Sequence, residues 1–183
     1  MNGDERITLN FYNKNDLKNI KINTVESNQG DLYTITTGVQ SVPANGFVVL
    51  QLTNPAKSGK AICVYWVLGG ATANTTLDVF RDAMFTAAGT TMTPENMNWA
   101  FENSSVMTAK FLAQSTDPTI GGTLLSSVAQ IGGTITKKYD GPLIIPSSKM
   151  ERQFYLRLAN NTNNSNLCSL NVMWRCSPLH IVC

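Results

Sequence analysis

The sequence has 183 residues, enough for one domain whose apolar core needs neither metals nor disulfides for stability. Hydrophobic residues make up 43% of the chain and charged residues only 14%. Because charged residues usually make up about 25%, the polar surface must come largely from Asn, Thr, Ser and Gln. The net charge is +2, and the Lys and Arg residues are scattered. This pattern argues against a nucleic-acid partner, which usually requires a concentrated basic patch.

Neither an export signal nor a membrane segment is predicted. No run approaches the ~18 consecutive apolar residues that span a bilayer. The first residues, MNGDERITLNFYNKND, carry acids where a secretory signal has basic residues followed by an apolar stretch. We therefore expect a soluble protein that is made in the cytoplasm and has no membrane partner.

The beginning of the chain is predicted to be an extension of the main domain. Residues 1–30 are polar and rich in Asn and Lys. Two short alternating pieces, ITLNFYN and NIKINTV, predict marginal strands within this N-terminal arm. Arms of this kind often pack on a neighbouring subunit. The remaining residues, 31–183, are expected to form one β-sandwich domain.

From residue 31 onward, short β-prone runs alternate with turn signals. Residues 47–54 and 60–68 are apolar and flank a short polar loop, so we expect them to pair as an antiparallel hairpin. Many short strands without a long helical period predict an all-β fold, a single antiparallel β-sandwich resembling a jelly roll. The later runs are TTLDVFRDAMF, SSVMTAKFLAQS, GTLLSSVAQIGGTITKKY, GPLIIP, RQFYLRLAN and NLCSLNVMWRC.

One short segment carries a helix start signal. In TMTPENMNWAF, Thr93 can cap a helix, Pro94 fits the first helical position and Glu95 fits the first turn. The asparagines that follow do not favour extension, so we expect a single helical turn.

Three pairs of adjacent glycines border β-prone runs. They are typical of bulges or bends at which a sheet changes direction. A phosphate-binding loop would require a following helix, which the sequence does not predict. The pairs are Gly69-Gly70, Gly121-Gly122 and Gly132-Gly133.

The sequence predicts no catalytic, cofactor or metal site. The motifs GxSxG, HExxH, GxxxxGK[ST] and GxGxxG are missing, and the single histidine, His180, lies near the chain end, a poor platform for a catalytic base. A carboxylate pair for glycoside cleavage is harder to exclude, but most acids border turns. The cysteines form no CxxC, so we expect reduced structural thiols rather than zinc ligands. They are Cys63, Cys168, Cys176 and Cys183.

Arg81 and Asp82 stand side by side in an otherwise apolar run. Because neighbouring residues of a strand point to opposite faces, the two charges cannot form a salt bridge with each other while the strand stays regular, and each then needs a separate partner. Arg81 shares a face with Leu77 and Val79, which favours anchoring to a carboxylate or carbonyls at an edge or subunit boundary. We take Arg81 and Asp82 as candidate interface or ligand contacts.

Aromatic residues supply the other binding candidates. Trp66 and Trp174 lie in apolar strands and are expected in the core. Trp99 and Phe101 follow Pro94 in a loop, where an aromatic ring either stacks on a sugar or anchors a partner subunit. Both alternatives remain open at the level of sequence.

Three sequence elements within residues 46–176 suggest a family. They are TNPAxSGK, TTLDVFRDAMFTAAGTTMTP and GGTLLSSVAQIGG, and they resemble segments of small β-sandwich proteins from the structural regions of tailed phages and prophages. The resemblance implies a non-enzymatic virion component, such as a capsid or neck decoration, a head fibre or a tail-associated protein. It implies no particular functional residues.

The expected partners follow from this resemblance. A virion protein would pack on other virion proteins and on copies of itself, and closed symmetric oligomers are the common solution. We expect a homo-oligomer, with a trimer as the first choice. The alternative is a carbohydrate- or receptor-binding module whose ligand is a glycan of the host surface.

Overall fold

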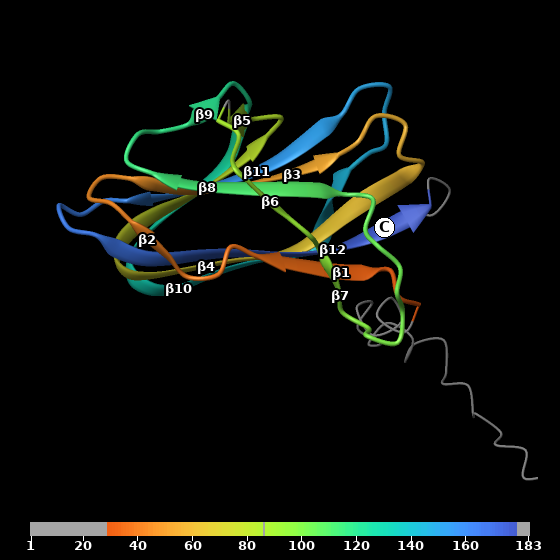
Figure 1. Ribbon diagram of the computed structural model, residues 1–183, viewed down its shortest axis with the longest axis horizontal. Helices are drawn as coiled ribbons and strands as arrows, with labels where there is room; N and C mark the ends of the chain where they lie inside the picture. Colours follow the sequence, from red (N-terminus) through yellow and green to blue (C-terminus); the bar gives the residue numbers. More distant parts are fainter. Residues whose placement is uncertain (1–28, 86, 179–183) are drawn as a thin grey trace, which may run out of the picture.

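The computed structural model describes residues 29–85 and 87–178 (Figure 1). All regular elements in this part of the chain are β-strands, and their pairing is antiparallel, so the predicted all-β antiparallel fold is confirmed. The described residues include no helix with the length and apolarity that a membrane crossing requires. The predicted arm strands, His180 and Cys183 lie outside the described residues.

Within the described residues, ten strands form one sheet and two form a small separate sheet, β5–β9. The order in the large sheet is β6-β8-β3-β11-β4-β12-β1-β7, with β10 also beside β4 and β2 beside β12. The strands are β1 (Leu32–Thr36), β2 (Gln40–Val42), β3 (Phe47–Asn54), β4 (Lys60–Arg81), β5 (Met84–Phe85), β6 (Thr90–Met92), β7 (Glu95–Asn96), β8 (Thr108–Gln114), β9 (Thr119–Ile120), β10 (Thr123–Ile145), β11 (Arg152–Asn160) and β12 (Asn166–Pro178).

The large sheet curls until its two halves face each other (Figure 1). One half contains β8, β3 and β11, and the other contains β12 and β1. Strand β4 belongs to both halves, because residues 75–81 pair with β11 while residues 60–71 pair with β12. The sandwich is therefore one continuous curled sheet, a half-barrel, rather than two separate sheets.

The long hairpin β4–β10 bends as it passes from one half to the other. Gly132 and Gly133 have φ angles of 81° and 91°, a left-handed region that favours glycine. The pairing register with β4 shifts between Ile131 and Gly133. The predicted bend at this glycine pair is confirmed, whereas Gly69-Gly70 lies in a regular part of β4.

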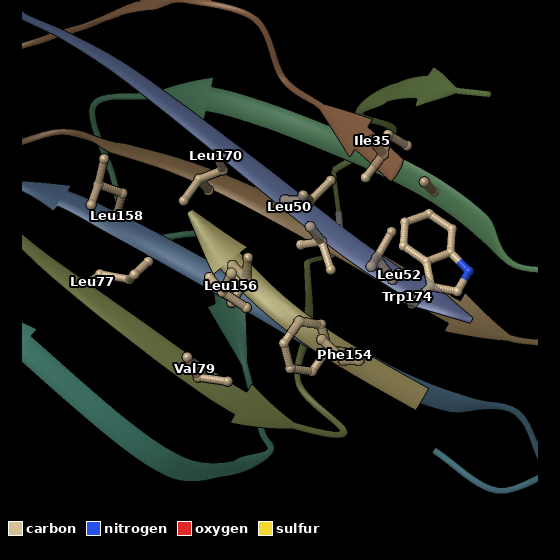
Figure 2. Close-up of a cluster of buried hydrophobic side chains, with 14 of the residues drawn as sticks. Ile35, Leu50, Leu52, Leu77, Val79, Phe154, Leu156, Leu158, Leu170 and Trp174 are labelled. Atoms are coloured by element: carbon tan, nitrogen blue, oxygen red, sulfur yellow. The ribbon is translucent and has the colours of Figure 1, made fainter. Parts of the chain in front are cut away.

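Apolar side chains from both halves meet in the core (Figure 2). Trp174 of β12 is fully buried, as predicted, and lies among Leu50 and Leu52 of β3. Trp66 is only partly buried, because it packs on a smaller cluster around Tyr65, away from the main core. The core leucines, valines and aromatics thus hold the two halves together through apolar burial.

The predicted hairpin between residues 47–54 and 60–68 is wrong. Both segments are strands, but β3 pairs with β8 and β11, while the first part of β4 pairs with β12 and β10. The link over residues 55–59 therefore crosses between the two halves. Asn54 stabilises this crossing, because its amide Nδ2 donates to the carbonyl oxygens of Lys60 and Ile145 at 3.1 and 3.3 Å.

The predicted helical turn after Thr93 is also wrong. Glu95 and Asn96 form β7, which pairs with Tyr33 and Thr34 of β1. Pairing with β1 provides partners for backbone N–H and C=O groups that a helix would have paired with one another. The chain from β6 to β7 therefore crosses from one half of the sheet to the other, since β6 pairs with β8 (Figure 1).

Candidate functional site

The backbone at Asp82 brings the two charges of the Arg81-Asp82 pair together. Strand β4 ends at Arg81, and Asp82 has a φ angle of 56°, which turns the chain out of the strand. Aspartate is one of the few residues other than glycine that tolerate this conformation. The Nε atom of Arg81 lies 3.9 Å from Oδ2 of Asp82, because the regular strand that would have kept the two side chains apart ends at Arg81.

Asp82 is fixed to the first residues of β11. Its backbone N–H donates to the carbonyl oxygen of Gln153 at 2.9 Å, and its Oδ1 accepts from the Gln153 N–H at 3.2 Å. Its Oδ2 lies 3.2 Å from Nη2 of Arg152. The carboxylate of Asp82 therefore joins the end of β4 to the start of β11 and holds two guanidinium groups beside each other.

A cavity of about 400 Å³ opens beside these charges. Arg81, Asp82 and Arg152 lie on its wall together with Gln153. The remaining lining is apolar and comes from both ends of β10, the segment after it and β11. These apolar residues are Leu125, Leu143, Ile144, Ile145, Pro146 and Phe154.

The charged wall has an excess of positive charge. Two guanidinium groups share the one carboxylate of Asp82, and the side chain of Arg81 is 60% exposed and that of Arg152 39% exposed. The neighbouring acid Glu151 lines a different cavity together with Lys110, but its Oε1 accepts from Nε2 of Gln153 at 2.9 Å, so a second carboxylate lies behind this wall. The cavity therefore combines an apolar interior with a positive, solvent-accessible rim.

Trp99 and Phe101 lie in a separate loop, after β7, and they do not line this cavity. Trp99 is 94% exposed. The ring of Phe101, in contrast, packs directly on Gly30: a Cβ atom added to Gly30 would lie only 2.4 Å from Cγ of Phe101. The loop is held to the start of β1, since Asn96 Nδ2 donates to the Gly30 carbonyl at 2.8 Å. Phe101 thus anchors the loop, and Trp99 is the ring available to a partner.

The sequence reasoning did not identify the ion pairs of Arg157. Nη2 of Arg157 lies 2.8 Å from Oδ2 of Asp78, which is almost fully buried, and its Nη1 contacts Asp117. The guanidinium also lies over the ring of Phe80, 5.1 Å from the centroid. The available signal was the charge of Asp78 within an apolar strand, because a buried carboxylate requires a cationic partner. This cluster ties the loop before β9 to the sheet.

The cysteines differ in their state. Cys168 and Cys176 are buried free thiols, and burial raises the pKa of Cys168 to about 11, so its reactive thiolate is disfavoured. Cys63 is disulfide-bonded, so the expectation of a reduced thiol is wrong there. In the described ranges, no three residues among His, Cys, Asp and Glu are grouped closely enough to hold a metal ion.

Comparisons of this chain with protein-family models, with curated proteins and with solved structures found no match.

Proposed function

We propose that the protein is a non-enzymatic structural component of a tailed-phage or prophage particle, as a capsid or neck decoration, a head fibre or a tail-associated protein. It acts in the virion by self-assembly and by packing on other virion proteins. The sequence resemblance supports the class of particle. The observation that supports assembly is the exposed apolar edge formed by β10.

Strand β10 is long and has one unpaired backbone edge. Among the described strands it pairs only with β4, although it extends over 23 residues. An edge strand that is long and apolar is a template for pairing with another chain. Five of its apolar side chains are exposed: Leu124, Leu125, Val128, Ile131 and Ile144.

The first part of β10 lacks the residues that usually protect an edge. Residues 123–131, TLLSSVAQI, contain no charged residue and no proline, whereas Lys137 and Lys138 lie in the second part. Charged and proline residues are the usual means of preventing edge-to-edge association. We therefore place the contact between copies at residues 123–131, within a closed homo-oligomer.

Mass spectrometry of purified particles tests the particle assignment. Particles are purified through a density gradient from a strain that carries the gene, and their proteins are digested and quantified. The proposal expects this protein at a constant copy number relative to the major capsid protein. Its absence from intact particles would disprove the assignment.

Light scattering coupled to gel filtration tests the contact at β10. We expect a defined oligomer for the unchanged chain and a monomer for Val128→Lys, because a charge at this position opposes burial of the edge. The control is Val39→Lys, which places the same charge at an exposed valine in the segment between β1 and β2. Equal masses for the two variants would contradict an interface at β10. The measured mass also distinguishes a trimer, our first choice, from a twofold dimer.

One observation favours the second candidate function, a carbohydrate- or receptor-binding module. Trp99 is almost fully exposed on a loop that is fixed to β1, and an exposed indole is suited to stacking on a sugar ring. Binding of the labelled protein to host cells or immobilised host glycans should be lost in Trp99→Ala. The control Met150→Ala removes another exposed apolar side chain and should bind normally. A folded Trp99→Ala variant with full binding would exclude this function.

A further inference from the structure

The interior of the cavity beside Arg81 is suited to an apolar group. Phe154 and Ile145 line it, and both belong to the buried core, with exposed fractions of 1% and 5%. Leu143 is half-buried and Pro146 is exposed, and both also line the cavity. An apolar part of a ligand that displaces water from these side chains is stabilised by the hydrophobic effect. The volume of about 400 Å³ lies within the range of small-molecule pockets.

The rim of the same cavity is suited to a carboxylate. The contact between Arg81 and Asp82 is 3.9 Å long, beyond hydrogen-bond distance, so this contact leaves the Arg81 donors unused. A guanidinium group binds a carboxylate through two parallel N–H···O bonds. On the cavity wall itself, the two positive charges of Arg81 and Arg152 outweigh the one negative charge of Asp82, so a carboxylate is attracted to these guanidinium groups.

We propose that this cavity binds monocarboxylates with an aliphatic body of medium length, with the carboxylate at Arg81 and Arg152 and the chain against Phe154. An acidic sugar fits less well, since its hydroxyl groups would face six apolar residues without hydrogen-bond partners. A neutral aliphatic molecule leaves the two guanidinium groups without an added partner. The cavity shares Leu125 with the contact proposed between copies at residues 123–131, whereas the charged residues Arg81, Asp82 and Arg152 are not part of that segment.

Calorimetric titration of the full chain tests the ligand class with three probes. Decanoate, kept below its micellar concentration, is expected to bind once per chain. Decanol has a similar chain without the charge, and acetate has the charge without the chain. Both are expected to bind at least roughly tenfold more weakly, since a tenfold change corresponds to the loss of one modest interaction. Equal binding of decanol and decanoate would overturn the proposed role of the arginines.

Three variants test the assigned residues. Arg81→Gln is expected to weaken decanoate binding by roughly fivefold to tenfold, because it removes a charge-assisted hydrogen bond. Asp82→Asn removes the competing carboxylate and tolerates the left-handed backbone, so decanoate should bind several-fold more tightly. The control Lys138→Gln removes the same charge as Arg81→Gln from an exposed position outside the cavity.

The outcomes separate a specific site from a general charge effect. The proposal expects Lys138→Gln to keep the affinity of the unchanged chain, while the two cavity variants move in opposite directions. Equal weakening in Arg81→Gln and Lys138→Gln would overturn it, because only the net charge would then matter. Thermal unfolding of each variant verifies the fold, and Arg81 is suited to this test because its exposed side chain contributes little to the core.

Discussion

At the scale of single residues, Asp82 has two structural roles that few residue types combine. Its backbone adopts a φ angle of 56°, and its carboxylate accepts from the Gln153 N–H and pairs with Arg152. Glycine would satisfy the backbone but not the charges, and glutamate would satisfy the charges but strain the backbone. Aspartate and asparagine are among the few residues that tolerate the left-handed region and still offer a side-chain acceptor.

Replacement of Asp82 by alanine should destabilise the fold. Asp82→Ala loses the acceptor and forces a residue with a Cβ into the left-handed region, so the free energy of unfolding should fall by about 1–3 kcal/mol. Asp82→Asn keeps the backbone preference and should lose less than about 1 kcal/mol, because the ion pair with Arg152 is partly exposed to solvent. Urea denaturation measures both values. Equal stability of the alanine variant and the unchanged chain would contradict this account.

Two buried tyrosines predict how stability changes at high pH. Burial raises the pKa of Tyr33 and of Tyr155 to about 12. Unfolded tyrosine loses its proton near pH 10, so between about 10 and 12 the folded protein binds protons that the unfolded chain has lost. The free energy of unfolding should therefore be unaffected by these groups below pH 10 and should fall as the pH rises towards 12.

Urea denaturation between pH 8 and about 11.5 measures this decline. The double variant Tyr33→Phe with Tyr155→Phe should show a shallower decline than the unchanged chain. A residual slope is expected, because burial also raises the pKa of Cys168 and of Tyr139. An identical slope in both proteins would show that the two hydroxyl groups do not control the alkaline limit.

Sequence reasoning identified Arg81 and Asp82 of the candidate site but neither their partner Arg152 nor their arrangement. Arg81 and Asp82 attract notice as charges in an apolar run. Their contact depends on the end of β4 at Arg81, and the alternation rule is valid only while a strand continues. Likewise, the sequence presents Trp99 and Phe101 as two loop aromatics with the same candidate role. Only the packing of Phe101 on Gly30 distinguishes the anchoring ring from the exposed one.

At the scale of elements, the β-prone runs were predictable, but their pairing was not, and neither was the joining of successive runs into the long strands β4 and β10. The predicted strand 47–54 coincides with β3, yet its partners β8 and β11 are remote in sequence. The five-residue link over residues 55–59 is long enough to close a hairpin within one half of the sheet, and it is also long enough to cross from one half to the other. Which one forms depends on burial of both strands in the core, a property of the whole sheet that no local pattern contains.

Two buried amides fix the end of the sandwich at which β11 turns into β12. Asn166 Oδ1 accepts from the Thr72 N–H at 3.0 Å and from the Ala73 N–H at 3.1 Å, where β4 bends. Asn160 Nδ2 donates to the carbonyl oxygen of Pro43 at 2.7 Å. These bonds connect the turn to β4 and to the loop before β3. From the sequence, NNTNNSN indicated only a break between strands, although its first and last asparagines, Asn160 and Asn166, carry these structural roles.

Removal of the Asn166 amide should destabilise the protein strongly. Asn166→Ala removes a buried side chain and leaves the partly buried N–H groups of Thr72 and Ala73 without their acceptor, so the free energy of unfolding should fall by about 2–4 kcal/mol. The matched control is Asn163→Ala in the same turn, whose side chain makes only an exposed contact of 3.4 Å with Asn45. We expect the control to change stability by less than about 0.5 kcal/mol, measured by urea denaturation. Similar losses in both variants would contradict the assigned role.

At the scale of the whole molecule, the two sides of the curled sheet differ in how they end. On one side, the crossing from β6 to β7 links the two halves (Figure 1). On the other side, β10 follows β4 along both halves and presents its unpaired edge. Apolar side chains are exposed along this second side, and the cavity beside Arg81 opens between the two ends of β10. Both proposed binding surfaces therefore involve β10.

Because β4 and β10 belong to both halves, the molecule should unfold in one step. Fluorescence of the buried Trp174 and circular dichroism of the strands should give the same urea midpoint. If copies associate through β10, this midpoint should rise with protein concentration, since association stabilises the folded state by mass action. The midpoint of Val128→Lys should not depend on concentration. Two separate transitions in Val128→Lys would show that the two halves of the sheet fold independently. A midpoint of the unchanged chain that does not depend on concentration would show that copies do not associate at the concentrations tested.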